Sequence, residues 1–281
     1  MRLFLFLAIG TQVVLLLPEL PGNGSTLLHG TWVVLATVLL GWQVVTYLKR
    51  KRHMLYARLG LHVPQAAPGY VRALFDDYAE TYDQHLTQEL AYNAPEALLE
   101  SLVPRLNERR LAIADLGCGT GLCGPLFAPY ARSLVGIDLS GKMIDLARTR
   151  KVYHELVTTD LLDYLHRHQH RFDLCLAADV LVYTGDLRPV FTAVAHSLAA
   201  GGYFAFTVET ATDRKWRLQS TGRYAHSSVY VRTLASATGF EILDSRPVSY
   251  RLQHGQPVPG AIWLLQTLAG VPRGDRAYSN W

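Results

Sequence analysis

A glycine-rich segment between an apolar run and a helical one constrains the fold of this chain more than any other feature. Residues 113–122 read IADLGCGTGL, and the apolar run Leu111–Leu116 predicts a strand that ends just before the first glycine. Glycines stand at positions 117, 119 and 121. Glycine adopts positive φ without steric cost and lets a ligand approach the backbone closely. The segment therefore predicts a tight strand-to-helix turn that binds a ligand.

Short apolar runs and amphipathic segments alternate along most of the chain. The predicted strands are Leu111–Leu116, Ser133–Asp138, Tyr153–Thr158, Phe172–Ala178, Tyr203–Val208, Phe240–Ser249 and Ala261–Thr267. The predicted helices are Tyr70–His85, Pro95–Arg105, Leu122–Tyr130, Lys142–Lys151, Leu161–His168, Leu187–Ala199 and Ser227–Thr238. Near-continuous apolar strands between helices are typical of a parallel sheet covered on both faces. We predict an α/β fold with a doubly wound sheet and an antiparallel edge.

Acidic residues stand at the ends of the first three predicted strands. Asp115 precedes the first glycine by two residues, Asp138 ends the second strand, and Asp160 follows the third. The spacing GxGxG with a preceding acid differs from the dinucleotide motif GxGxxG and suits a cationic amino-acid group better than a pyrophosphate. An acid at the end of the second strand of such sheets hydrogen-bonds ribose hydroxyls. Asp138 and Asp160 could also cap helices.

These motifs resemble those of class I methyltransferases that depend on S-adenosylmethionine (SAM). DLGCGTG at 115–121 is similar to the first motif of that family, and GIDLSGKMIDLA at 136–147 is similar to its second. The resemblance covers about 70 to 268 and implies a Rossmann-like, seven-stranded sheet and SAM as the cofactor. The segments FDDYAETYDQHL, AADVLVYTGDL, GGYFAFTVE and GRYAHSSVYVRTLASATGFEIL resemble predicted methyltransferases that are fused to tetratricopeptide repeats. No such repeat is visible in this sequence.

The resemblance implies a set of cofactor-binding residues. Asp115 and the glycines would hold the methionine end of SAM, Asp138 the ribose, and Asp160 with the Leu161 backbone the adenine. Tyr82, in an N-terminal lid, would reach the cofactor carboxylate or pack as a core aromatic. The full expected set is Asp115, Gly117, Gly119, Gly121, Asp138, Leu139, Met143, Asp160, Leu161 and Tyr82.

Candidates for the chemical step follow the fourth and fifth predicted strands. Methyl transfer is an in-line displacement that needs positioning and, where the nucleophile carries a proton, a base. The candidates are Asp179, Tyr183, Glu209 and His226. We expect His226 to be the base because histidine titrates near neutrality, although a capping or packing role is the alternative. No metal site is expected, since the three cysteines lack paired spacing and the histidines at 166–170 are predicted to lie on the surface.

Charge is distributed unevenly along the chain. The formal net charge is +4, yet residues 1–48 carry only Arg2 and Glu19, and the tetrad Lys49–Arg52 supplies four positive charges. The rest of the chain is therefore electrically balanced. A balanced globular part does not favour nucleic acid as a partner.

Two apolar stretches, Leu3–Leu17 and Leu27–Leu48, precede the basic tetrad. They predict a hairpin of two transmembrane helices, with the first stretch alternatively a signal peptide. The tetrad predicts that residues 53–281 lie on the cytoplasmic side of the membrane, which we expect to be a bacterial inner membrane. The expected domains are a membrane anchor at 1–52 that binds the lipid bilayer, a juxtamembrane linker at 53–69, and a methyltransferase domain at 70–281.

The function that these expectations favour is a membrane-anchored SAM-dependent methyltransferase with a lipophilic small-molecule acceptor. Three alternatives stay open. The acceptor could be a polar metabolite or a protein, and the chain could be a structural or assembly subunit of a membrane protein complex. An NAD oxidoreductase is the least favoured, because of the glycine spacing.

Overall fold

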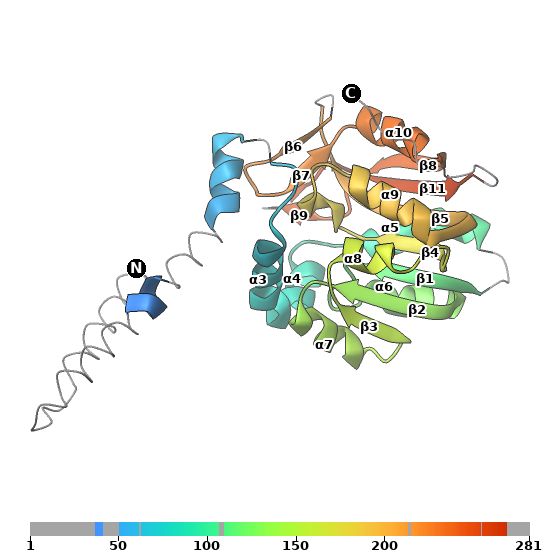
Figure 1. The fold of residues 1–281 in the computed structure, drawn as a ribbon, viewed down its shortest axis with the longest axis horizontal. Helices are drawn as coiled ribbons and strands as arrows, with labels where there is room; N and C mark the ends of the chain where they lie inside the picture. The colour runs from blue at the N-terminus through green and yellow to red at the C-terminus, as the bar shows by residue number, and fades with distance from the viewer. Residues whose placement is uncertain are drawn as a thin grey trace, which may run out of the picture. The chain divides into compact units, whose positions relative to one another are not determined.

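The computed structural model describes residues 37–41, 51–61, 63–106, 110–212, 215–253 and 255–268. The chain divides into two compact units, Met1–Arg52 and His53–Trp281. In the first unit the described residues 37–41 and 51–52 are helical. The second unit contains the sheet (Figure 1).

Seven strands form the main path of a mixed sheet in the second unit. They are β1 (Leu111–Leu116), β2 (Ala131–Asp138), β3 (Glu155–Thr158), β4 (Phe172–Ala177), β5 (Leu198–Thr210), β8 (Phe240–Val248) and β11 (Gly260–Thr267). Their order in the sheet is β3-β2-β1-β4-β5-β11-β8. The strands β3, β2, β1, β4 and β5 run parallel to one another, whereas β11 runs antiparallel to both β5 and β8. The predicted Rossmann-like α/β sheet with an antiparallel strand near one edge is confirmed.

Two short strands that the sequence pattern does not predict extend the sheet. β7 (Tyr224–His226) pairs in parallel with the end of β5, and β6 (Trp216–Leu218) pairs antiparallel with β7. Three-residue strands are too short for an alternating pattern to be recognised. A further small hairpin, β9 (Leu252–Gln253) with β10 (Gln256–Pro257), lies between β8 and β11 in the chain.

The helices begin close to the predicted positions. They are α3 (Pro68–Tyr78), α4 (Tyr82–Gln88), α5 (Ala94–Leu102), α6 (Cys123–Phe127), α7 (Gly141–Thr149), α8 (Leu161–His166), α9 (Arg188–Ser197) and α10 (Ser228–Ala237). Three of them have side-chain N-caps, because Ser140, Asp160 and Ser227 accept hydrogen bonds from amides in the first turns of α7, α8 and α10. The single helix predicted over 70–85 is instead α3 and α4, joined by a 3₁₀ turn at Ala79–Thr81.

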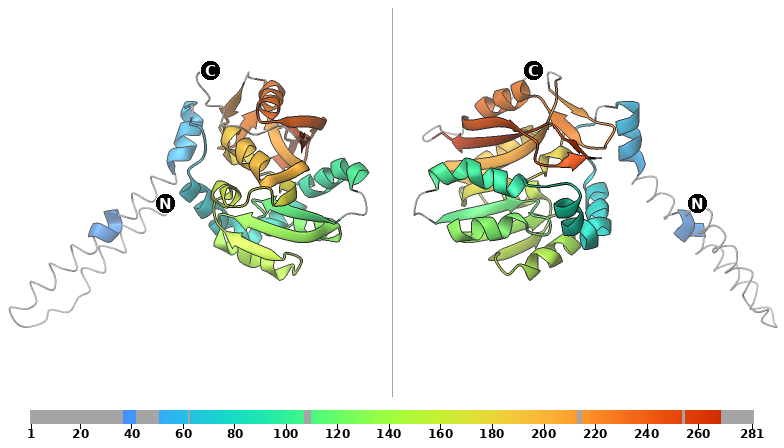
Figure 2. Two further views of the ribbon diagram at one scale, coloured as in Figure 1. Left: turned by 45° about the vertical axis from the view of Figure 1, so that its right-hand side comes forward. Right: turned by 180° about the vertical axis from the view of Figure 1, so that it is seen from behind.

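Helices cover both faces of the sheet (Figure 2). Apolar residues on the central strands build a core on each face. In β4, Phe172, Cys175 and Ala177 pack with α8, α9 and α10, whereas Leu174 and Leu176 pack with α5 and α6 on the opposite face. All of these strand residues are buried. Burial of both faces explains why the strands read as continuous apolar runs, and it leaves the carboxyl ends of the strands as the place for a site.

Residues 53–69, expected as a linker, pack within the second unit. The His53 ring nitrogen Nε2 lies 2.8 Å from Gly222 O, and the Tyr224 hydroxyl donates to Val63 O at 2.9 Å. Ala57 and Ala66 are buried in the same small cluster. This segment therefore forms part of the wall beside β6 and β7.

Across the described ranges, the structure contains no helix that combines the length and the apolar character needed to cross a membrane. The predicted localisation, an integral membrane protein with its catalytic domain on the cytoplasmic face, is therefore wrong. The physical reason is that a helical span takes about 20 consecutive apolar residues, which none of these helices supplies. Apart from 37–41, the two stretches on which the hairpin was predicted lie outside the described residues.

Candidate active site

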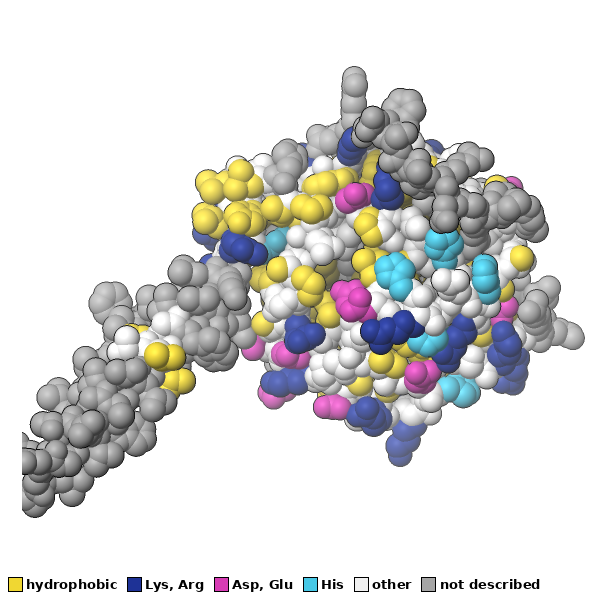
Figure 3. Space-filling model, viewed as in Figure 1, with side chains coloured by type: hydrophobic (Ala, Val, Ile, Leu, Met, Phe, Trp, Pro, Cys, Tyr) yellow, Lys and Arg dark blue, Asp and Glu magenta, His cyan; other side chains and the backbone are white. Residues whose placement is uncertain are grey.

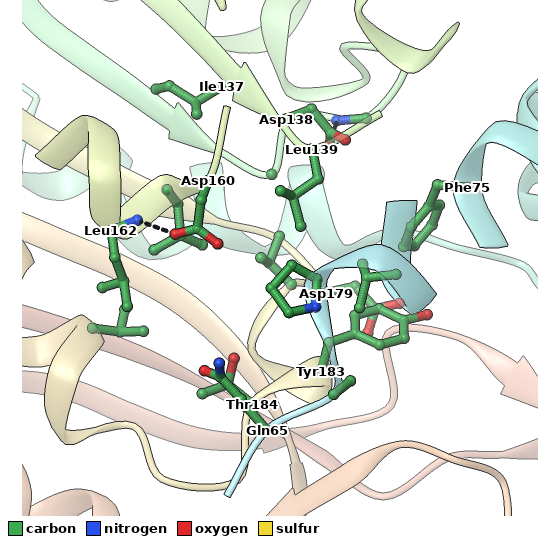
Figure 4. A pocket seen from close by; sticks show the side chains of 18 of the residues that line it. Gln65, Phe75, Ile137, Asp138, Leu139, Asp160, Leu162, Asp179, Tyr183 and Thr184 are labelled. Atoms are coloured by element: carbon green, nitrogen blue, oxygen red, sulfur yellow. Dashed lines mark hydrogen bonds between the residues drawn. The ribbon is translucent and has the colours of Figure 1, made fainter. Parts of the chain in front are cut away.

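A cavity of about 120 Å³ opens at the carboxyl ends of the parallel strands (Figure 4). Four strand ends and the N-terminal helices supply its walls: Gly117 and Gly119 after β1, Ile137–Leu139 at the end of β2, Thr159–Leu162 after β3, Ala178–Val180 after β4, and Phe75 and Tyr82 from α3 and α4. Open α/β sheets bind their ligands at this edge, where connections leave to opposite faces.

The loop after β1 requires glycine at its first position. Gly117 has φ of +65°, and a Cβ atom there would lie 2.7 Å from Val180 Cγ2 and 2.8 Å from Val180 Cγ1. Gly119 also has positive φ, +55°, but a Cβ atom there would meet only Tyr82 Cε1 at 3.8 Å. Gly121, with φ of +83°, faces the Tyr153 ring instead of the cavity. The loop backbone thus forms one wall of the cavity because Gly117 and Gly119, which line it, carry no side chain.

Asp138 lies at the end of β2, and its carboxylate accepts hydrogen bonds from both the glycine loop and the start of the next helix, α7. Its Oδ2 accepts from Gly119 N at 2.9 Å and its Oδ1 accepts from Ser140 N at 2.8 Å. Burial raises the pKa of Asp138, and these two amide hydrogen bonds lower it in part. Each carboxylate oxygen has a second lone pair. Asp138 can therefore hold the loop and accept hydrogen bonds from a ligand at the same time.

A second aspartate faces the cavity from the start of α8. Asp160 Oδ1 accepts from Leu162 N at 2.8 Å, which caps the helix, and Figure 4 shows the carboxyl group at the cavity wall. Leu139 lines the cavity from the end of β2, and Leu161 lines it beside Asp160. This part of the cavity combines apolar walls with carboxylate acceptors, the arrangement that a nucleoside requires.

Asp115 lies behind the glycine loop and lines a smaller adjoining cavity of about 20 Å³. It is 1% exposed, and the Tyr153 hydroxyl donates to its Oδ2 at 2.6 Å. Burial raises the pKa of Asp115 to about 7; the Tyr153 hydrogen bond opposes this shift and the charge of Asp138 adds to it. A cationic group in this cavity would restore the ionised carboxylate. Tyr82 lines both cavities.

We call helices α3 and α4 the lid (residues 68–88). Side chains of the lid form hydrogen bonds with the loops that carry these aspartates. Arg72 Nε donates to Leu139 O at 3.1 Å, and Ser140 Oγ donates to Asp76 Oδ1 at 2.5 Å. Ser140 is at once the N-cap of α7. The first lid helix is therefore bonded to the chain segment directly after Asp138.

The second lid helix, α4, is hydrogen-bonded to the glycine loop through Asp83. Thr120 Oγ1 donates to Asp83 Oδ1, and Arg150 Nη2 donates to Asp83 Oδ2, both at 2.5 Å. Arg150 Nε also donates to Thr120 O at 2.5 Å. We call Asp83, Thr120 and Arg150 the latch. It connects the lid to the glycine loop, whose Thr120 lines the smaller cavity.

Asp179 marks the other end of the cavity, between β4 and the 3₁₀ turn Leu181–Tyr183. It has φ of +58°, an uncommon value for a residue with a side chain. Its N–H donates to Thr207 Oγ1 at 2.8 Å. Phe75 and Tyr183 lie at the same end with their ring centroids 5.4 Å apart in an edge-to-face arrangement. Strained backbone at a cavity wall is typical of a functional position.

A cluster of buried and partly buried ions lies next to Asp179. Arg223 Nη2 donates to Asp179 Oδ1, and Arg223 Nε donates to Glu209 Oε1 at 2.6 Å. Arg251 Nη2 donates to the same Glu209 oxygen at 2.5 Å, and Gln219 Nε2 donates to Glu209 Oε2 at 2.5 Å. Burial would raise the pKa of Glu209, but the two arginines outweigh it and hold that pKa below its usual value. Glu209 is therefore an ionised partner of arginine and does not line the cavity.

His226 is not brought to the cavity. It is fully buried in β7, and its Nε2 lies 2.9 Å from Thr184 O and 3.1 Å from Gly185 O. Burial lowers its pKa to about 4. The ring holds the loop after the 3₁₀ turn, so we do not place His226 among the reacting groups. Met143 is likewise 0% exposed and absent from the cavity lining.

Several lining and supporting residues were not predicted from the sequence. Phe75 and Val180 lie in segments quoted for the family resemblance but were given no role there, and Arg223 meets Asp179 across 44 positions of the chain. Gln65 reaches the cavity because it forms an isolated bridge with Thr184. Arg223 likewise lies in the quoted GRYAHS segment, and its partner could not be read from that segment.

Comparison with known proteins adds to this geometry. Residues 113–202 match the sequence model of a family described as a methyltransferase domain. Malonyl-[acyl-carrier protein] O-methyltransferase of Salmonella typhimurium is 28% identical over 137 residues, which cover 49% of this chain and 52% of that protein. The ubiquinone biosynthesis O-methyltransferase of Thiobacillus denitrificans is 28% identical over 116 residues, 39% of this chain and 49% of that protein. The chain thus spans about half the length of these curated relatives.

Solved structures share the fold. The [4+2]-cyclase SpnF superposes with a TM-score of 0.60 at 19% identity and covers 74% of this chain and 99% of its own. Magnesium protoporphyrin IX methyltransferase of Synechocystis PCC 6803, with bound S-adenosylhomocysteine (SAH), has a TM-score of 0.56 at 17% identity and covers 71% of this chain and 99% of its own. A cyclase and a methyltransferase thus share one architecture, so the fold alone does not define the reaction.

Fold, site and family match agree on one class: residues 113–202 match a methyltransferase domain, and the cavity beside them has the features of a site for SAM. Within this class, the curated relatives include O-methyltransferases of an acyl-carrier protein substrate and of ubiquinone biosynthesis. These matches do not single out the group fused to tetratricopeptide repeats, and that narrower resemblance stays a prediction.

Proposed function

We propose that this chain is a SAM-dependent O-methyltransferase whose acceptor is a small molecule with a neutral hydroxyl group on an apolar or aromatic body. The observation that carries the proposal is one continuous cavity with two different ends. Asp138, Asp160 and the glycine loop line one end, and Asp179 with Phe75 and Tyr183 lines the other.

The first end suits the cofactor. Asp138 would accept hydrogen bonds from the ribose hydroxyls, and Asp160 with the Leu161 backbone would bind the adenine. Asp115 would pair with the amino group of the methionine end, which fits its burial and its raised pKa. When bound, SAM supplies a methyl group on a positively charged sulfur.

Charge at the cavity wall distinguishes between acceptor classes. Asp138, Asp160, Asp179 and Asp186 line it, and no lysine or arginine does so within the described ranges. An acceptor carboxylate would be repelled by such a wall. This supports a neutral hydroxyl, as on a phenol, rather than a carboxylate acceptor.

The chemical step then needs a proton acceptor near the hydroxyl. Asp179 is the carboxylate at the aromatic end, and its pKa is raised by burial, with Arg223 and Arg251 opposing that shift. We assign it as the base: an oxygen–carbon bond forms as the sulfur–carbon bond breaks, the hydroxyl proton passes to Asp179, and neutral SAH leaves. Tyr183 and Phe75 orient the acceptor ring.

The viewed surface does not favour nucleic acid as the acceptor. Figure 3 shows Lys and Arg side chains interspersed with Asp and Glu side chains over the viewed face of the second unit. Nucleic-acid binding proteins instead gather basic side chains into a patch or stripe.

Calorimetry of the full chain with SAM and with SAH tests the cofactor half of the proposal. Asp138→Ala removes the predicted ribose contact and should weaken SAM binding at least about 10-fold. Asp145→Ala is the matched control, because that carboxylate is exposed on α7 and pairs with Arg148 on the same helix at 2.7 Å.

The acceptor half is tested by incubating the full chain with methyl-labelled SAM and a panel of phenols, carboxylic acids and amines. Label transfer to phenols is expected. Exclusive transfer to carboxylic acids would overturn the acceptor assignment. Absence of SAM binding would overturn the enzyme assignment and favour a structural or assembly role for the fold.

A further inference from the structure

Arg223 lies just outside the cavity, yet it contacts the proposed base directly. It precedes β7, and its side chain is 15% exposed. Its guanidinium donates to Asp179 Oδ1, to Glu209 Oε1 at 2.6 Å and to the Tyr183 hydroxyl at 3.3 Å. It also lies over the Tyr183 ring, 5.5 Å from the centroid. One side chain thus contacts two residues of the acceptor end and fixes both to the end of β5.

Asp179 needs such a contact because its backbone is strained. The left-handed region is unfavourable for a residue with a side chain, and such a conformation persists only where surrounding contacts determine it. Thr207 accepts the Asp179 N–H, and Arg223 holds the carboxylate. These two contacts fix both the direction of the Cα–Cβ bond and the orientation of the carboxylate.

A second arginine, Arg251, adds positive charge near Asp179 and Glu209 but does not hydrogen-bond Asp179. Arg251 binds Glu209, while its Nε lies 3.9 Å from Asp179 Oδ2, which is longer than a hydrogen bond. Arg223 is therefore the guanidinium that holds Asp179 itself, and the Asp179 Oδ2 atom is not committed to Arg251.

We propose that Arg223 is a positioning residue for methyl transfer: it holds the Asp179 carboxylate in the orientation in which the Oδ2 atom accepts the proton of the acceptor hydroxyl. The inference rests on the proposed role of Asp179. It gives a role to the GRYAHS segment beyond packing, since the arginine of this segment orients the base while the histidine holds the neighbouring loop.

The electrostatic consequence follows from the groups around Asp179. Those that face it are Arg223, Arg251, Glu209, Tyr82, Tyr92, Tyr183 and Tyr250. Burial raises the pKa of Asp179, and the two arginines oppose that shift. Removing Arg223 must raise this pKa further, so a larger fraction of Asp179 is protonated at a given pH and cannot accept a proton.

The test is a carboxyl titration of the full chain by NMR, with aspartate carrying ¹³C at Cγ. The Asp179 resonance is the one missing from Asp179→Asn. Arg223→Gln should raise its titration midpoint by about 1–3 units. Arg132→Gln is the matched control, because Arg132 pairs with Asp173 at 2.8 Å, does not line the cavity, and should leave the Asp179 midpoint unchanged. An unchanged Asp179 midpoint in Arg223→Gln would overturn the inference.

Arg223→Lys separates positioning from charge, and it also serves if Arg223→Gln does not fold. Lysine keeps the charge but cannot make the forked contacts. We expect a near-native Asp179 midpoint and unchanged SAH affinity, with turnover of the phenol acceptor reduced about 10-fold or more. Native turnover in this variant would refute a positioning role. The titration needs no acceptor, so a failed methylation assay and a failed inference give different results.

Discussion

The two ends of the cavity are built in different ways. The cofactor end is made by three short segments, 115–121, 137–140 and 159–162, in which the Asp138 and Asp160 carboxylates accept hydrogen bonds from amides two residues on or in the glycine loop. The acceptor end is made by residues that are far apart in the chain. Asp179 bonds to Arg223 across 44 positions, and Glu209 bonds to Arg251 across 42.

This difference has a physical origin. A common cofactor can be bound by backbone groups, helix N-termini and local aspartates, and these depend on the strand-to-helix turns of the fold. An acceptor is bound by side chains whose charges must be balanced after burial. That balance comes from partners that the sheet topology brings together, here β4, β5, β7 and the loop after β8.

The largest expected effect is on turnover, and it comes from replacing Asp179 at the acceptor end. Asp179→Asn keeps the shape of the side chain, and asparagine also tolerates positive φ. It removes the base, so turnover should fall about 10²- to 10⁴-fold. SAM affinity should change less than about twofold, because Asp179 lies at the other end.

Initial rates and calorimetry measure these two quantities. Asp163→Asn, on the exposed face of α8, serves as the control for a general effect of charge removal. A parallel loss of SAM affinity and turnover in Asp179→Asn would mean that the two ends are not separate.

An intermediate effect is expected in the glycine loop. Gly117→Ala combines positive φ with a Cβ 2.7 Å from the stiff, β-branched Val180, whereas Gly119→Ala has positive φ and a nearest contact of 3.8 Å. Gly117→Ala should therefore lower the free energy of unfolding by about 2–4 kcal/mol and weaken SAM binding. Gly119→Ala should cost only about 1–2 kcal/mol. Urea unfolding compares the pair, and equal losses would show that the Val180 contact has no effect.

The same contrast explains what could be read from the sequence. The alternating pattern and the glycine motif predict the sheet and the residues Gly117, Asp138 and Asp160 at its edge, because each depends on local geometry. His226 was expected as the base from its intrinsic pKa, but its burial in β7 lowers that pKa to about 4. Burial is a property of the whole fold, and a single sequence does not contain it.

The smallest effect tests whether the lid belongs to the cofactor end. Asp83→Asn removes the ion pair with Arg150 while keeping an oxygen for Thr120. Both partners of the ion pair are partly exposed, at 24% and 48%, so the pair contributes no more than about 1 kcal/mol and is screened by salt. SAH affinity should fall about two- to fivefold at low ionic strength and converge with that of the native chain at high salt. Calorimetry at two salt concentrations checks this, with Asp145→Asn on the outer face of α7 as the control. Asp83→Asn could instead leave SAH affinity unchanged and reduce only acceptor turnover. That result would mean that the lid, including Tyr82, belongs to the acceptor end of the cavity and not to the cofactor end.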